Sequence, residues 1–135
     1  ILGWIGGQSN LLPKDAFDAA HHIAMMEAVE ELRLKLGMTL NISDADAKKK
    51  AREEAAATTI PAWATKVENL IAGPFFGGKD ISVADLKLYM VVRWLTSGVL
   101  DHMPTTVLDP FPKLKGVFAA VGEHPGVKAW QAKHS

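Results

Sequence analysis

The segment from Ile81 to Leu86 most constrains how this chain folds, because it carries the signals of a specified helix start. Ser82 lies three residues before Asp85, so each side chain can accept a hydrogen bond from the other residue's backbone N–H. This is a capping box in which Asp replaces the usual Glu or Gln. Ile81 and Leu86 occupy the positions of a hydrophobic staple around it. We therefore predict a helix that begins at Ser82, with a structural capping role for Ser82 and Asp85.

The residues after this start are apolar on nearly every face, which is typical of a helix buried inside a bundle. Polar side chains form only a narrow stripe that includes Asp85, Tyr89 and Arg93. We predict a central buried helix from Ser82 to Ser97. Tyr89 is expected to be a core residue whose hydroxyl has a hydrogen-bond partner.

A long helix is expected before this central one. It should begin near Asp15 and end at Gly37, a glycine placed just past the last helical residue. Its apolar side chains recur at the spacing of one helix face that would pack on a core: Met25, Val29, Leu32 and Leu36.

A second long helix is expected to follow a weaker capping box formed by Ser43 and Asp46. The run of charges over residues 48–54 indicates a solvated helix face. A nucleic-acid patch would have aromatic side chains among its basic residues, and none lies in this run. Pro61 lies inside the helical pattern, where it removes an N–H and crowds the preceding turn. We therefore predict a kink from Thr58 to Pro61.

Two shorter helices complete the pattern, one that starts near Pro112 and ends at Gly122, and a last one from Pro125. No segment alternates with the period of a strand over a useful length. The glycines at 77 and 78 lack the spacing of a phosphate loop and are interpreted as a turn. The predicted fold class is therefore all-α, a bundle of about five helices around the buried helix from Ser82 to Ser97.

The composition excludes several classes of function. The chain has 135 residues, formal net charge +0 and no Cys, so it has no basic field for nucleic acid or anionic lipid and no thiolate chemistry. No apolar run is long enough to cross a membrane, and we expect a cytoplasmic protein. His21 and His22 are adjacent and point about 100° apart on a helix, so no metal site is predicted. The common catalytic motifs are absent, and no catalytic residue is predicted in this chain.

Four stretches together resemble a known family: residues 25–33, 75–85, 111–114 and 125–130. Their order resembles the all-helical C-terminal domain of cytosolic glutathione transferases, closest to the alpha, mu, pi and sigma group, with sigma favoured. The resemblance covers nearly the whole chain. It implies that residues 1–9 are a remnant of the last helix of a preceding thioredoxin-like domain plus a linker, and that residues 10–135 are the helical domain.

The resemblance also implies a function. The parent protein would be a homodimeric enzyme that conjugates glutathione, its co-substrate, to small hydrophobic electrophiles and needs no other cofactor. These residues would supply the electrophile pocket and dimer contacts. The residue that activates glutathione would lie upstream, so this chain alone is expected to be inactive. The alternative is a non-catalytic interaction module, as the same helical domain is in elongation-factor and synthetase-complex subunits.

Three residues are assigned roles by the resemblance. Glu31 corresponds to an Asp that reaches across the dimer interface to the partner's glutathione, although Glu is one methylene longer. The alternative for Glu31 is an exposed ion pair with Lys35. Met38 and Asn41 correspond to positions that line the hydrophobic-electrophile pocket.

Overall fold

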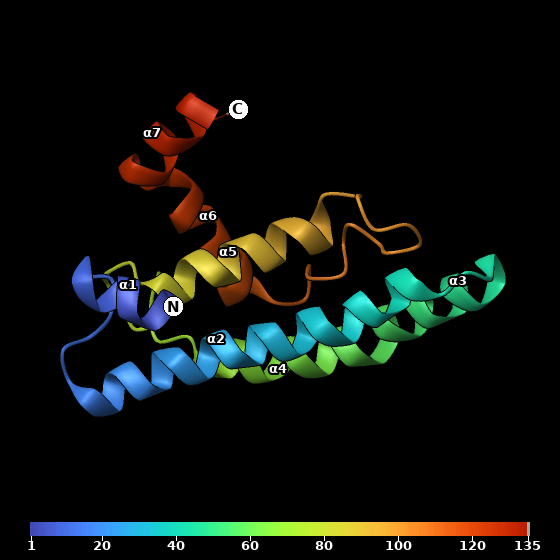
Figure 1. Cartoon of the computed structure of the whole chain (residues 1–135), viewed down its shortest axis with the longest axis horizontal. Coiled ribbons are helices and arrows are strands. Elements are labelled where there is room, and N and C mark those ends of the chain that lie inside the picture. Colours follow the sequence, from blue (N-terminus) through green and yellow to red (C-terminus); the bar gives the residue numbers. More distant parts are fainter. Residues whose placement is uncertain (135) are drawn as a thin grey trace.

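The computed structural model describes residues 1–134, and it confirms the all-α prediction (Figure 1). The only β-type pairing within these residues is an isolated bridge between Phe75 and Gly78. The helical elements in chain order are α1 (Leu2–Gln8), α2 (Ala16–Gly37), the 3₁₀ turn η1 (Met38–Asn41), α3 (Ala45–Glu54), the π-helical turn η2 (Ala55–Thr59), α4 (Ile60–Leu70), α5 (Val83–Thr96), α6 (Pro112–Glu123) and α7 (Pro125–His134).

The predicted central helix is α5, and its capping box is present. The Ser82 hydroxyl accepts the Asp85 N–H at 3.4 Å, while the Asp85 carboxylate accepts the Ser82 N–H at 2.8 Å and the Ser82 hydroxyl at 2.6 Å. The other carboxylate oxygen accepts the Phe76 N–H at 2.6 Å. Asp85 is fully buried. Its carboxylate joins the start of α5 to the turn that precedes it.

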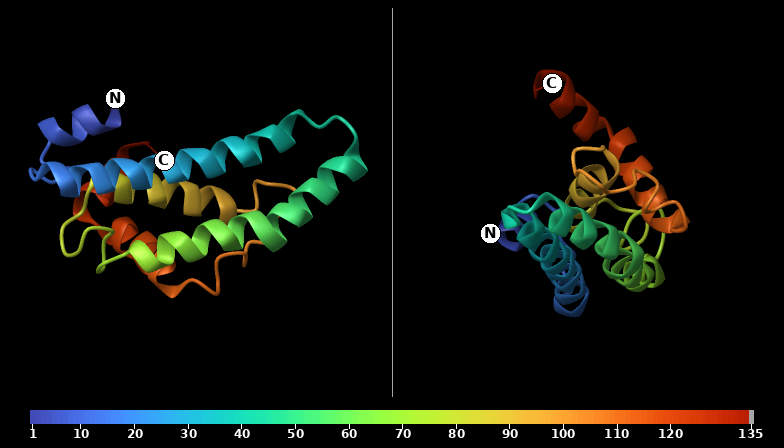
Figure 2. Two further views of the ribbon diagram at one scale, coloured as in Figure 1. Left: turned by 90° about the horizontal axis from the view of Figure 1, so that it is seen from below. Right: turned by 90° about the vertical axis from the view of Figure 1, so that its right-hand side faces the viewer.

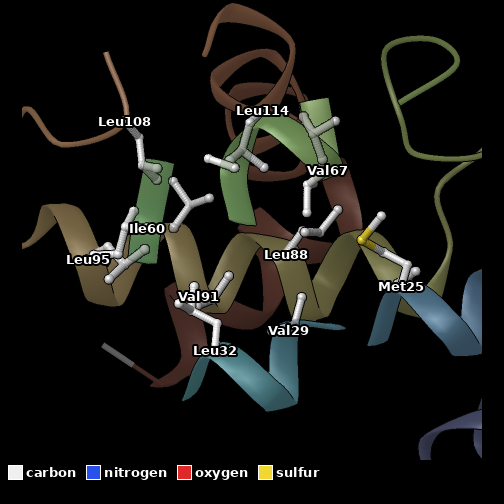
Figure 3. Packing of buried hydrophobic residues seen from close by; sticks show 14 of the residues in the cluster. Met25, Val29, Leu32, Ile60, Val67, Leu88, Val91, Leu95, Leu108 and Leu114 are labelled. Carbon is white, nitrogen blue, oxygen red and sulfur yellow. The ribbon is translucent and has the colours of Figure 1, made fainter. Parts of the chain in front are cut away.

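Helices α2, α4, α5 and α6 enclose the core (Figure 2). Helix α5 packs between α2 and α6, and α4 contacts both α2 and α6 on the other side. Their side chains interdigitate along α5 (Figure 3), among them Val29, Leu32, Ile60, Leu88 and Leu114. The half-buried Tyr89 of α5 accepts a hydrogen bond from the Gln131 side chain of α7 at 2.8 Å, which confirms the predicted partner for its hydroxyl.

Helix α2 begins as predicted, with the Asp15 carboxylate accepting the N–H groups of the first turn. It also ends at Gly37 as predicted, but the predicted glycine cap is wrong. Gly37 keeps a right-handed conformation with φ −58°, and the chain continues directly into η1. The Thr39 hydroxyl donates to the Leu36 carbonyl at 2.6 Å, so a side chain rather than a left-handed glycine satisfies the end of this helix.

The second long helix is the run α3–η2–α4, and two details of its start differ from the prediction. Asp44, rather than Ser43, caps α3 by accepting the Ala47 N–H at 2.7 Å. Arg52, which belongs to the run interpreted as solvated, is only 3% exposed. Its guanidinium donates to the Thr39 hydroxyl at 2.6 Å and to the Asp101 carbonyl at 3.0 Å, so it joins α3 to η1 and to the loop after α5.

Where the sequence predicts a kink, the helix run contains the π-helical turn η2, which ends two residues before Pro61. Proline has no N–H to donate to the preceding turn, and the backbone there widens. Further along α4, the Glu68 carboxylate accepts the N–H groups of Lys113 and Leu114, both at 2.8 Å. A side chain of α4 thus caps α6 across the bundle and fixes how the two helices meet.

Candidate functional site

Helix α2 presents three faces, and two of them are open to solvent. The first packs on the core through Met25, Val29, Leu32 and Leu36, as predicted. A second face carries Ala24, Ala28, Glu31 and Lys35 and lines a groove. A third carries Ile23, Glu30 and Leu34, and Met38, the first residue of η1, continues this face at helical spacing. The candidate functional residues from the sequence lie on the last two faces and on η1, which follows them.

The groove lies between α2 and α4 and has a volume of about 640 Å³. Its floor is apolar and includes Met25, Leu32 and Val67 from the core. The half-buried Trp63 of α4 lines it, and its indole N–H donates to the Ala28 carbonyl at 3.0 Å, which ties the two helices together. The groove is therefore an apolar recess whose two walls are joined by a hydrogen bond.

Glu31 stands at the edge of this groove, and its side chain is 67% exposed. It forms the ion pair with Lys35 that the sequence suggested as the alternative, with 2.7 Å between Nζ and Oε1. The hydrogen bond from Lys35, with smaller contributions from its charge and that of Lys66, lowers the pKa of the Glu31 carboxyl. Glu31 is therefore an anion held at an exposed helix face beside an apolar recess.

The third face of α2 forms an apolar strip, defined by Leu34 and Met38, which are 58% and 66% exposed. Glu30 lies one turn before Leu34 and bridges Arg33 of its own helix and Lys87 of α5. The hydrogen bond from Arg33, and then that from Lys87, lower the pKa of Glu30 to about 2. Large exposed apolar side chains at adjacent positions of one helix face mark a surface that takes an apolar partner or ligand.

Of the two pocket residues predicted from the sequence, Met38 belongs to this strip and Asn41 lies three residues beyond it, and neither lines the groove. Met38 begins η1 and Asn41 ends it, and both are exposed. Leu40, between them in the chain, is also 57% exposed. The buried Arg52 and Thr39 hold this turn from beneath, so the exposed side chains of η1 stand on a supported backbone.

Sequence reasoning missed Trp63 and Lys66, which form the α4 wall of the groove. The register between α2 and α4 depends on the π-helical turn and the loop before it, and no periodicity in either helix reveals it. Leu34 is missed because its spacing of four residues from Met38 is equally compatible with a buried helix face. Only the structure shows that both side chains are exposed.

Within residues 1–134 no three His, Cys, Asp or Glu side chains gather closely enough to hold a metal ion. Over the same residues no helix has both the length and the apolar character needed to span a membrane.

The fold defines a class of domain: an all-helical bundle built around a buried, capped helix, beside a long helix run that contains a π-helical turn. A family model described as the glutathione S-transferase C-terminal domain matches residues 30–134. The chain therefore belongs to the family of glutathione S-transferase C-terminal domains. No curated protein matches the chain.

Several solved structures share the fold at low sequence identity. One is a prostaglandin synthase D of Nilaparvata lugens, with TM-score 0.87 and 20% identity over 100% of this chain and 66% of that one. Another is a Pi-class glutathione S-transferase of Onchocerca volvulus, with TM-score 0.79 and 22% identity over 98% of this chain and 62% of that one. A rat hPGDS complexed with a quinoline has TM-score 0.77 and 17% identity over 92% of this chain and 60% of that one. This chain thus spans less than two thirds of each of these proteins.

Proposed function

We propose that the protein carrying this chain is a glutathione transferase, in which these residues supply the pocket for a hydrophobic electrophile and the contacts of a homodimer. Glutathione is its co-substrate, no other cofactor takes part, and its location is cytoplasmic. Another domain of the enzyme makes the glutathione thiolate available, and the thiolate attacks the electrophile. Residues 1–135 alone do not conjugate glutathione.

The observation that carries this proposal is the apolar strip of α2 together with the supported turn η1. Leu34 of α2 and Met38 of η1 are 58% and 66% exposed, and they stand at adjacent turns on the side of α2 that faces away from the core. We assign the electrophile pocket to Leu34 and Met38, which form the apolar strip, and to Asn41. An electrophile with an aromatic or aliphatic body would remove this apolar surface from water, at about 25 cal/mol per Å².

The division of the chain is part of the same proposal. We assign residues 1–9 to the last helix of a thioredoxin-like domain plus a linker, and residues 10–135 to the helical domain. Helix α1 contacts α5 through the buried Gly6, and it leaves Leu2 and Trp4 exposed on its outer side. An apolar outer face is expected where a further domain packs.

The dimer contact and the glutathione contact are assigned to the groove face of α2. Glu31 supplies the carboxylate that reaches the ammonium group of glutathione bound to the other subunit. The groove carries an anion at Glu31 and cations at Lys35 and Lys66 around an apolar floor. Because a two-fold axis brings the same patch of both copies together, a surface with both signs of charge can be complementary to itself.

The interaction-module alternative has the same fold, and the fold alone does not separate the two functions. The family match and the solved structures of transferases favour the enzyme.

Steady-state kinetics on the natural gene product test the residue roles. Met38→Ala should raise KM for an apolar electrophile severalfold and leave KM for glutathione unchanged. Met90→Ala on α5 is its matched control, because Met90 is 60% exposed. Glu31→Ala should raise KM for glutathione. Glu53→Ala is the control for this variant, because Glu53 is also paired with a lysine four residues away. Equal effects of a variant and its control would refute the assigned role.

A further inference from the structure

A second cavity adjoins the groove, with which it shares His21, Leu70 and Phe76, and it lies apart from the apolar strip. It has a volume of about 640 Å³ and opens between residues 10–14, the first turns of α2 and the loop over residues 76–82. Nothing in the proposed transferase function uses it. His22 of α2 lines its wall and is only 6% exposed, which is unusual for an ionisable side chain.

The ring of His22 is held in one orientation, and one of its nitrogens is left open. Nδ1 lies 2.8 Å from the Asp18 carbonyl, and Phe76 packs against the ring edge at a centroid distance of 4.9 Å. A carbonyl oxygen only accepts hydrogen bonds, so Nδ1 carries the hydrogen, and Nε2 of the neutral ring is an acceptor. Nε2 has no hydrogen-bond partner within residues 1–134.

Gly77 packs closely against the ring of His22. A Cβ atom at Gly77 would stand 2.6 Å from Nε2 and 2.8 Å from Cε1 of His22. The positive-φ glycines in the described chain are Gly78 and Gly98, so the backbone conformation of position 77 does not itself require glycine. The requirement at Gly77 is room for the His22 ring, so a side chain at this position would displace the ring from the cavity wall.

The remaining lining indicates what kind of molecule fits. Lys14, Lys79, Asp18 and Asp80 stand around the opening, and none of them is in an ion pair within residues 1–134. Asp18 precedes His22 by four residues, so the two side chains share one face of α2. Apolar side chains such as Leu12 and Phe76 complete the wall. The cavity therefore offers a hydrogen-bond acceptor, unpaired charges of both signs and an apolar surface.

We propose that this cavity binds an apolar amino acid, or a short peptide with free ends, as its zwitterion. The ammonium group donates to Nε2 of His22 and lies near Asp18, the carboxylate faces Lys14 and Lys79, and the apolar body packs on the wall. This site stands independently of the transferase proposal, because it uses neither the apolar strip nor glutathione, and none of the charged residues assigned to the dimer contact lines it.

Phenylalanine is the probe, titrated into the 15N-labelled natural gene product that contains these residues and followed by NMR. Binding should shift the His22 Nε2 resonance and the Gly77 amide resonance saturably. N-acetylphenylalanine amide, which lacks both charges, should bind about tenfold more weakly or worse, because it forfeits the charge-assisted contacts.

Two pairs of variants locate the site. Gly77→Ala should abolish the shifts, while Gly116→Ala should keep them, since a Cβ at Gly116 meets open space. Asp18→Asn should weaken binding about tenfold. Asp46→Asn should leave it unchanged, since Asp46 is an exposed acid in the first turn of α3 as Asp18 is in the first turn of α2.

The proposal is overturned if phenylalanine causes no saturable shift at His22 and Gly77, or if the uncharged analogue binds equally well. It is also overturned if folded Gly77→Ala binds as the wild type does. If Gly77→Ala does not fold, the Asp18→Asn variant decides the question. The site is then refuted if Asp18→Asn binds phenylalanine as tightly as Asp46→Asn does. None of these results bears on glutathione conjugation, so a failure here is distinct from a failure of the transferase proposal.

Discussion

The buried carboxylate of Asp85 should be among the most important side chains for stability. It accepts the N–H groups of Phe76 at 2.6 Å and Ser82 at 2.8 Å, and the Ser82 hydroxyl at 2.6 Å. Asp85→Ala removes these three hydrogen bonds and leaves the two backbone N–H groups buried without an acceptor. Each such group costs about 1–3 kcal/mol, so we expect a loss of about 4 kcal/mol in the free energy of unfolding.

The isosteric variant separates charge from shape. Asp85→Asn keeps the volume, but each carboxylate oxygen faces at least one N–H donor, so the amide must set its own NH₂ group against a donor. We expect a loss of about 2 kcal/mol for Asn. Asp46→Ala, an exposed acid in the first turn of α3, should cost less than about 1 kcal/mol.

Urea unfolding followed by far-ultraviolet circular dichroism measures these changes, with equal m values for all variants as the condition for comparison. A loss under 1 kcal/mol for Asp85→Ala would refute the reasoning, because it would mean that the buried amides find other partners at little cost.

Three further predictions concern single side chains. Glu68→Gln should lower the free energy of unfolding by about 1–2 kcal/mol in the same urea assay, because a neutral amide has one acceptor for the two N–H groups that start α6; no change would contradict the cap. Arg52→Lys should cost about 2 kcal/mol, because an ammonium group cannot reproduce the two hydrogen bonds of the buried guanidinium; a stability equal to that of wild type would show the contacts to be unimportant. The lowered pKa of Glu30 means that its contribution to stability is complete above about pH 4.5 and is lost as the pH falls toward 2, so the difference in stability between wild type and Glu30→Gln should shrink over that range. A difference that grows with falling pH in unfolding measurements would reverse the assigned sign.

The central helix could be predicted from the sequence because its start depends on residues close together in the chain. Ser82 and Asp85 are three residues apart, and local capping needs nothing else. The Phe76 N–H that Asp85 also binds is nine residues away, and only the folded turn reveals it. Helix α2 ends at Gly37 as predicted, but its cap differs, because the Thr39 hydroxyl binds the Leu36 carbonyl and Gly37 keeps a right-handed conformation.

The residues whose roles the sequence did not reveal make contacts with residues far away in the chain. Arg52 looked like part of a solvated run, but it reaches the Asp101 carbonyl 49 residues further along. Glu68 caps a helix that starts more than 40 residues later. Neither contact leaves a periodic signal in the sequence. For the same reason the cavity at His22 and Gly77, which joins the start of α2 to a later turn, was invisible to pattern reasoning.

The most direct test of the central claim compares two proteins in one assay. Conjugation of glutathione to a chlorodinitrobenzene is measured in parallel for the purified 135-residue chain and for the natural gene product that contains these residues. The account predicts turnover well above buffer for the gene product and none above buffer for the chain alone. Turnover by the chain alone, or a folded gene product that conjugates no electrophile, would contradict it.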